Sequence, residues 1–321
     1  MQNLQLSDAL KASTPGSSAS NRIARFRPLL LAFPALLLVL PCTSCADLTA
    51  VASFATSAKN ASTGYSDIVT DFAGSASRRS LLVSEDQKQT VLAQAQAYKD
   101  LEPDLLAAQK PLTDYIAALA AISTNTADTA GKSSAASGSS ATSVGSTAKS
   151  SSTSAKSASL QKAGLTQSQA TAAMGLATKV SAALTAAYRS DKTGKAIHDC
   201  NPELQDYLVG LEHIVGTDYP LALDVEKTST EAYYSDLLHK YASTEPLAAM
   251  TVRLQEKQDI DAISKRKLAA AAYVKILTDI GEGHQKLADA GEKMTPKQLV
   301  TIIEPYASDI YTQSQSVAKA F

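Results

Sequence analysis

Small or apolar residues recur at alternating steps of three and four near the start of the chain. They stand at Leu48, Val51, Ala55, Ala58, Ser62, Tyr65, Val69 and Phe72. This spacing places one stripe along a helix and predicts an amphipathic helix packed against partners. A heptad stripe can also indicate self-assembly, but fewer than four repeats with alanine at two stripe positions favour a helical bundle.

The next apolar periodicity predicts a second helix over residues 85–122. Ser84 and Gln87 form the pattern of a capping box at its start. Pro103 and Pro111 lie inside the pattern. Because each proline removes a backbone donor and clashes with the preceding turn, we expect this helix to be kinked or split at one of them.

Four further helices follow from the same periodicity. A third opens at a capping box of Thr166 and Gln169 and closes around residue 194; a fourth spans about 201–241 and is perturbed at Gly216 and Pro220. The fifth begins near residue 245, ends between 281 and 291, and shows apolar residues at Leu247, Met250, Leu254, Ile263, Ala270, Val274, Leu277 and Ile280. The sixth and last helix begins near residue 295.

No stretch alternates β-branched and polar residues for long enough to predict a strand. The expected fold class is therefore all-α: an elongated antiparallel helical bundle built from residues 45–122 and 160–321. Residues 123–159 separate the two parts, and 20 of these 37 residues are Ser or Thr. This segment has little to bury and is expected to be a disordered insert, either an expanded loop or a tether that can carry glycans.

The first 44 residues have the layout of an export signal. Arg22, Arg25 and Arg27 precede an apolar run from Leu29 to Leu40, and small residues follow. The run has twelve residues, whereas a helix needs about 20 to cross a bilayer core. A removable signal peptide is therefore expected rather than a permanent membrane span.

Thr43 and Ser44 are small and stand directly before Cys45. This pattern resembles the lipobox of bacterial lipoprotein precursors, although Cys42 occupies the place where that family usually has leucine. The resemblance implies that the signal is cut before Cys45 and that this cysteine carries lipid. The alternative is an ordinary secreted protein in which Cys45 remains a free thiol. Since Ala46 rather than an aspartate follows, the resemblance favours the inner leaflet of an outer membrane over the inner membrane.

Charge and cysteine content narrow the function classes. Removal of residues 1–44 takes four of the 30 basic and one of the 31 acidic residues, which leaves a net charge of −4. Nucleic acid is therefore not an expected partner. With Cys42 removed and Cys45 lipidated, Cys200 is the last cysteine and has no disulfide partner within the chain.

The residues that often carry chemistry form no recognisable set. His198, His213, His239 and His284 have no spacing of three or four between them, so no helical metal site is expected. His198, Asp199 and Cys200 are adjacent, but adjacent residues point in different directions, and no catalytic or cofactor-binding residue is assigned. Gly281 and Gly283 are expected to break a helix.

Acidic residues and tyrosines are numerous in the second half of the chain. The acids, including Glu203, Glu212, Glu226 and Glu231, are expected on solvated helix faces. The tyrosines are expected either to cap the ends of the core or to line a ligand groove between helices, with their hydroxyl groups at the surface.

These patterns favour a non-enzymatic protein of the cell envelope that is held at a membrane facing the periplasm by lipid on Cys45. It is similar to helical periplasmic lipoproteins of proteobacteria, and its expected partner is an envelope protein or cell-wall material. A carrier for a small or apolar ligand, bound near Tyr207, His213 or Tyr273, is the alternative. An envelope hydrolase would require the scattered acids or histidines to meet in a cleft.

Overall fold

The computed structural model describes residues 49–123, 156–186, 193–290 and 296–321. Over these residues the chain is helical and contains no strand, which confirms the all-α prediction. The helices belong to one compact unit, Thr43–Phe321. Cys45 and most of the predicted Ser/Thr-rich insert lie outside the described residues, although Ser123 belongs to a helix and residues 156–162 are helical.

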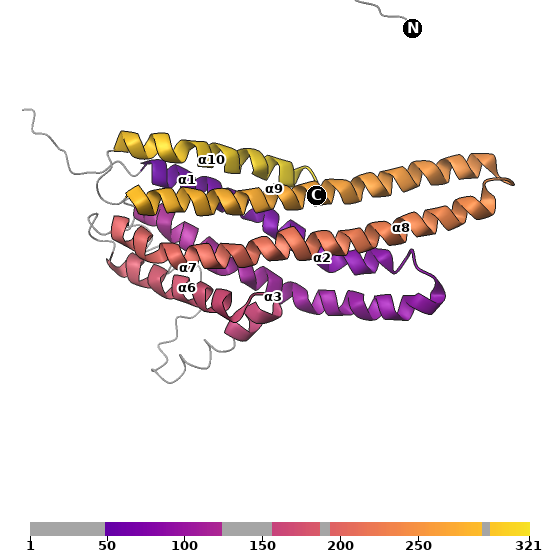
Figure 1. Ribbon diagram of the computed structural model, residues 1–321, viewed down its shortest axis with the longest axis horizontal. Coiled ribbons are helices and arrows are strands. Elements are labelled where there is room, and N and C mark those ends of the chain that lie inside the picture. The colour runs from indigo at the N-terminus through magenta and orange to yellow at the C-terminus, as the bar shows by residue number, and fades with distance from the viewer. Residues whose placement is uncertain (1–48, 124–155, 187–192, 291–295) are drawn as a thin grey trace, which may run out of the picture. The chain divides into compact units, whose positions relative to one another are not determined.

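The predicted first helix is present as α1 (Thr49–Ala61) and α2 (Thr63–Arg79), joined by one turn at Ser62. The described members of the predicted stripe are all buried, from Ala55 at 0 % exposed to Ser62 at 9 %. A tight turn over residues 80–84 leads to α3 (Glu85–Ser123), which returns alongside α2 (Figure 1). Both Pro103 and Pro111 lie inside α3, so the helix is not split at either proline.

The second half of the bundle begins with α6 (Gln167–Ala186) and α7 (Thr193–His213). Thr166 and Gln169 form the predicted capping box: the Gln169 N–H donates to Thr166 Oγ1 at 3.3 Å, and the Thr166 N–H donates to Gln169 Oε1 at 2.9 Å. A π-helical turn, η2 (Ile214–Asp218), connects α7 to α8 (Tyr219–Tyr241). The perturbation expected at Gly216 and Pro220 is therefore a change of helix type without a break.

After a short turn, α9 (Pro246–Ala290) runs antiparallel to α8, and α10 (Pro296–Ala318) packs against α9 and α1. The predicted helix break at Gly281 and Gly283 is wrong, because α9 continues through both residues. A Cβ atom on Gly283 would lie 2.7 Å from Phe54 Cε2. This glycine therefore lets α1 approach α9 closely, and tertiary packing outweighs its low helix propensity.

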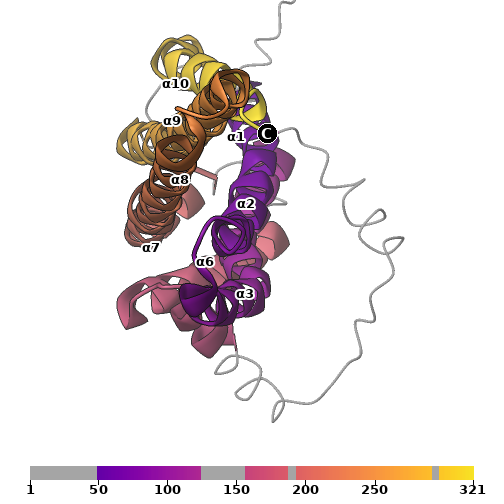
Figure 2. The same ribbon diagram turned by 90° about the vertical axis from the view of Figure 1, so that its right-hand side faces the viewer.

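The pairwise contacts close a ring in the order α1, α3, α6, α7, α9 and α10 (Figure 2). Beyond this ring, α2 lies between α3 on one side and α8 and α9 on the other. The core is continuous and is built mainly from alanine, leucine, isoleucine and tyrosine. Of the apolar residues predicted along α9, Ile263, Ala270, Leu277 and Ile280 are buried, whereas Leu247, Met250 and Leu254 are exposed.

Candidate functional site

The residue predicted to carry lipid, Cys45, lies outside the described residues. Three residues, Ala46 to Leu48, separate it from Thr49 at the start of α1. Among the helices that the structure describes, none combines the length and the apolar character that crossing a membrane requires.

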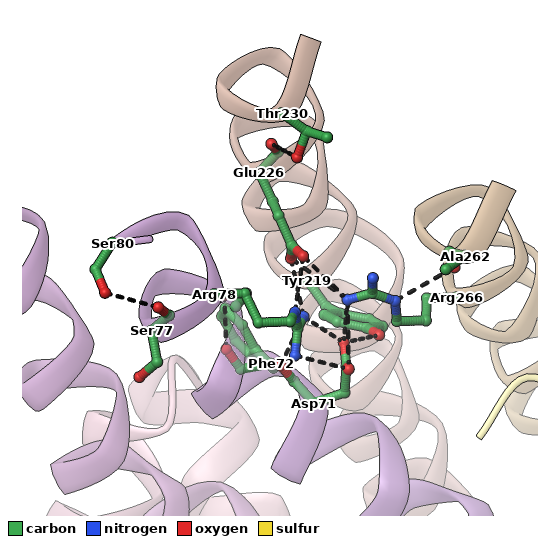
Figure 3. A network of polar contacts seen from close by, with 11 residues as sticks. Asp71, Phe72, Ser77, Arg78, Ser80, Tyr219, Glu226, Thr230, Ala262 and Arg266 are labelled. Atoms are coloured by element: carbon green, nitrogen blue, oxygen red, sulfur yellow. Dashed lines mark hydrogen bonds and ion pairs between the residues drawn. The ribbon is translucent and has the colours of Figure 1, made fainter. Parts of the chain in front are cut away.

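A network of partly buried charges joins α2, α8 and α9 (Figure 3). Arg78 donates from Nε and Nη2 to the two carboxylate oxygens of Glu226 at 2.7 and 2.9 Å. Arg266 donates from Nη1 to the same carboxylate at 3.2 Å and lies 3.5 Å from the Asp71 carboxylate. Asp71 also accepts from Arg78 at 3.0 Å and from the Tyr219 hydroxyl at 2.7 Å.

The local sequence explains how these groups meet. Asp71 and Arg78 are seven residues apart on α2, and Tyr219 and Glu226 are seven residues apart on α8. Two helical turns place such residues on one face, so each helix contributes a pair to the same interface. This spacing is a signal in the sequence that each pair shares one helix face, but it does not identify the helix that the face contacts.

The network is partly shielded from solvent, and Glu226 is its most deeply buried member. Side-chain exposure is 5 % for Glu226, 12 % for Arg266, 14 % for Asp71 and 35 % for Arg78. The expectation of a solvated face is therefore wrong for Glu226, because its two arginine partners come from helices distant in sequence. Burial lowers the pKa of Arg78, but its bond to Glu226 and the charge of Asp71 outweigh that effect and raise this pKa overall.

Two positive and two negative side chains face one another in this network, and each carboxylate has several donors. The Tyr219 pKa is raised by burial and by Asp71, so its hydroxyl keeps its proton. Each charged group of the network is therefore engaged by a group of opposite charge. The network fixes the positions of α2, α8 and α9 relative to one another.

A second polar cluster lies between α3, α7 and α9. His284 Nδ1 donates to Asn201 Oδ1 at 2.9 Å, and its Nε2 accepts from the Tyr115 hydroxyl. Gln205 donates to Asn201 Oδ1 at 3.1 Å and to the Gly281 carbonyl at 2.8 Å. Burial lowers the pKa of His284 to about 3, so the imidazole is neutral. Each of its two ring nitrogens has a hydrogen-bond partner.

The three adjacent residues His198, Asp199 and Cys200 do not form a catalytic arrangement. His198 and Asp199 are exposed, with side-chain exposure of 74 % and 45 %, whereas Cys200 is 2 % exposed. Burial raises the pKa of the Cys200 thiol to about 11, which keeps it protonated and weakly nucleophilic. Within the described residues, no group of three or more His, Cys, Asp or Glu side chains is placed to hold a metal ion.

Several tyrosines lie deeper than expected. Tyr207, Tyr219 and Tyr273 are at most 1 % exposed, so the expectation that their hydroxyl groups reach the surface is wrong. The ring of Tyr273 lies 5.7 Å from that of Tyr65, and its hydroxyl accepts from Gln109 at 3.0 Å. His213 lies on the surface, so these residues do not converge on the ligand pocket considered from the sequence.

A partly open hollow of about 390 Å³ lies where α3 and α8 flank α2. Phe72 of α2 lines it together with Tyr98 and Leu101 of α3 and Leu221 and Val225 of α8. Gln94, Lys162 and Asp218 add polar groups to its lining. Sequence periodicity did not predict this recess.

Comparison of the chain with protein-family models, with curated proteins and with solved structures found no match. The function proposed below therefore rests on the residues and the geometry of this chain.

Proposed function

We propose that this chain is a lipid-anchored helical protein of the bacterial cell envelope, held at a membrane facing the periplasm by lipid on Cys45. In this proposal it is a non-enzymatic interaction or structural component that contacts an envelope protein or cell-wall material. The observation that carries the proposal is the order of the basic flank, the apolar run and the small residues before Cys45, followed almost at once by the folded bundle.

Lipid chemistry accounts for stable attachment. Each buried methylene contributes about 0.8 kcal/mol, and a single acyl chain anchors only marginally, so the two or three chains of a bacterial lipoprotein give a durable anchor. Four residue steps from Cys45 to Thr49 span at most about 14 Å. The start of α1 would therefore stay close to the membrane.

Because the short link holds α1 at the membrane, the N-terminal end of α9 would be left available to partners. Phe54, near the start of α1, packs against Gly283. Leu247 lies 36 residues before Gly283 on α9, which corresponds to about 54 Å along the helix. The turn between α8 and α9 would thus be presented away from the anchored end.

The chemistry of the described residues supports a role without catalysis. Arg78, Arg266 and their carboxylate partners neutralise one another, His284 is a buried neutral imidazole, and Cys200 is a buried thiol. Such groups are suited to holding helices together, whereas catalytic acids, bases and nucleophiles need access to substrate.

Metabolic labelling with radioactive palmitate in a bacterial host tests the anchor. We expect the wild-type chain to incorporate label and Cys45→Ser to lose it. Cys42→Ser is the matched control, because it removes a neighbouring thiol and should keep the label. Equal labelling of the Cys45→Ser variant and the wild type would overturn the proposal.

The hollow between α3 and α8 favours one second candidate, a carrier for an apolar ligand. A fluorescent fatty acid added to the full chain would then bind with enhanced emission, and Val225→Asp would weaken binding because it places a charge on the apolar wall. Unchanged emission on mixing with the wild-type chain would exclude this candidate for that ligand class.

A further inference from the structure

The outward face of α9 carries an apolar stripe that no described helix covers. The large apolar side chains of α9 that are exposed are Leu247 at 84 %, Met250 at 62 %, Leu254 at 55 % and Leu268 at 71 %. They share one line of alternating three- and four-residue steps, here called the α9 seam: Leu247, Met250, Leu254, Lys257, Asp261, Ser264, Leu268 and Ala271. Every member of this line is exposed.

The α9 seam is separate from the face of α9 that builds the core. Ala249 and Ile263, at 6 % and 1 % exposed, lie on the buried face. Five of the eight seam residues are apolar, three at one end and two at the other, with Lys257, Asp261 and Ser264 between them. Single exposed leucines are ordinary, but exposed residues with this spacing and with apolar groups at both ends are suited to a coiled-coil contact. From Leu247 to Ala271 the seam is about 36 Å long, so a single helix can cover all of it.

We propose that the α9 seam is the contact surface between two copies of this chain, with the two α9 helices antiparallel about a twofold axis. In the register we infer, Lys257 faces the partner's Asp261, and Leu254 faces the partner's Ser264. Met250 then faces the partner's Leu268, and Leu247 faces the partner's Ala271. This pairing does not depend on lipid at Cys45.

Charge complementarity selects this partner and register. Within one helix Lys257 already donates to Asp261. The twofold axis brings two such pairs together at the centre of the seam, so that each Lys257 also faces the partner's Asp261. A parallel pairing of two copies in register would instead place lysine against lysine and aspartate against aspartate. Shifting the antiparallel register by one heptad either way places Lys257 against the partner's Leu254 or Leu268, which buries a charge against an apolar group.

The far end of the seam has space for the partner. A hollow of about 600 Å³ lies where α10 ends against α9, with Leu268, Ala271 and Ala272 among its walls. Three lysines, Lys265, Lys275 and Lys319, also line it, and no acidic residue does. The proposed register brings the start of the partner's α9 to this hollow, so the partner's Leu247 meets its apolar wall and the partner's Glu245 approaches its lysines.

Sedimentation velocity of the full chain, in a detergent solution of matched density, tests the pairing. We expect the wild type to sediment as a dimer and the double variant Met250→Asp with Leu268→Asp to shift toward monomer, with a dissociation constant raised at least about tenfold. The matched control makes the same changes at Leu92 and Leu106, exposed leucines of α3, and should remain dimeric. Circular dichroism would confirm that the variants keep their helix content.

Charge reversal tests the register. Lys257→Glu alone and Asp261→Lys alone each place like charges opposite one another, so each variant should dissociate. An equimolar mixture of the two should form a dimer again, because glutamate then faces the introduced lysine while Asp261 of the first variant faces Lys257 of the second. Reversal of the exposed pair Lys110 and Asp114 on α3 is the control and should have no effect.

Three results would overturn the proposal. The first is a wild-type chain that remains a monomer at about 0.1 mM. The second is an oligomer that the changes at Met250 and Leu268 do not weaken, which would place the contact on another surface. The third is a mixture of the two charge variants that fails to associate, which would reject the antiparallel register.

Discussion

Glu226 is the residue whose replacement most directly tests the structural role of the buried charge network. Its carboxylate accepts from Arg78 at 2.7 and 2.9 Å and from Arg266 at 3.2 Å, and its side chain is only 5 % exposed. Glu226→Gln keeps the shape but removes the charge. Asp71 then remains as the carboxylate partner of both arginines in the network.

The expected loss in the free energy of unfolding follows from the contacts that remain in the Glu226→Gln variant. Removing one partner of a buried ion pair typically destabilises a protein by 3–5 kcal/mol, because a desolvated charge is left uncompensated. Here Asp71 still lies 3.0 Å from Arg78 and 3.5 Å from Arg266, and the glutamine oxygen can accept one bond. We therefore expect the lower end of the range, a loss of about 3 kcal/mol in the free energy of unfolding.

Urea denaturation followed by circular dichroism measures this loss. With a slope of about 3 kcal/mol per molar, the midpoint should fall by about 1 M. Glu231→Gln on the same helix is the matched control, since its pair with Lys227 is exposed and should change stability by less than about 1 kcal/mol. If the two variants lost equal stability, the network would not be fixing these helices.

Three other predictions follow from close packing and burial. Gly283→Ala should destabilise by about 1–3 kcal/mol because its Cβ would lie 2.7 Å from Phe54, whereas Gly175→Ala, with an ordinary 3.4 Å contact, should be neutral or stabilising in the same urea assay. Because burial lowers the pKa of His284 to about 3, the unfolded chain binds a proton first as the pH falls below about 6.5. Wild-type stability should then fall by up to about 1.4 kcal/mol per pH unit, and His284→Gln should flatten this slope between pH 6.5 and 5. The Cys200 thiol, with a pKa raised to about 11, should react with a disulfide reagent at pH 8 only after unfolding. In a chain with Cys42→Ser and Cys45→Ser, rapid labelling of the folded state would contradict its burial.

Local patterns carried enough information to predict the helices. The stripe from Val51 to Phe72 is buried as expected, and Thr166 and Gln169 form the capping box that their spacing predicts. Both features involve residues that are close in sequence. A helix face and a helix start are decided by neighbours within a few turns, so a single sequence reveals them.

Long-range contacts account for what the sequence could not reveal. Glu226 and Arg78 are 148 residues apart in the chain, so nothing near Glu226 distinguishes a buried acid from a solvated one. Gly283 has the same difficulty, because Phe54 decides whether a side chain fits there. Seven-residue spacing of polar groups on two helices hints at such an interface, but it does not identify the partner helix.

The α9 helix shows the same limit in another form. Leu247, Met250 and Leu254 follow the spacing of a buried stripe, and yet the chain leaves them exposed while Ala249 and Ile263 face the core. Apolar periodicity predicts that a helix face is suited to burial, but it does not identify the surface that buries it. In α9 one face is covered by the chain's own helices, and the pairing proposed here would cover the other by a second copy. A variant that dissociates without losing helix content would separate these two roles of one helix.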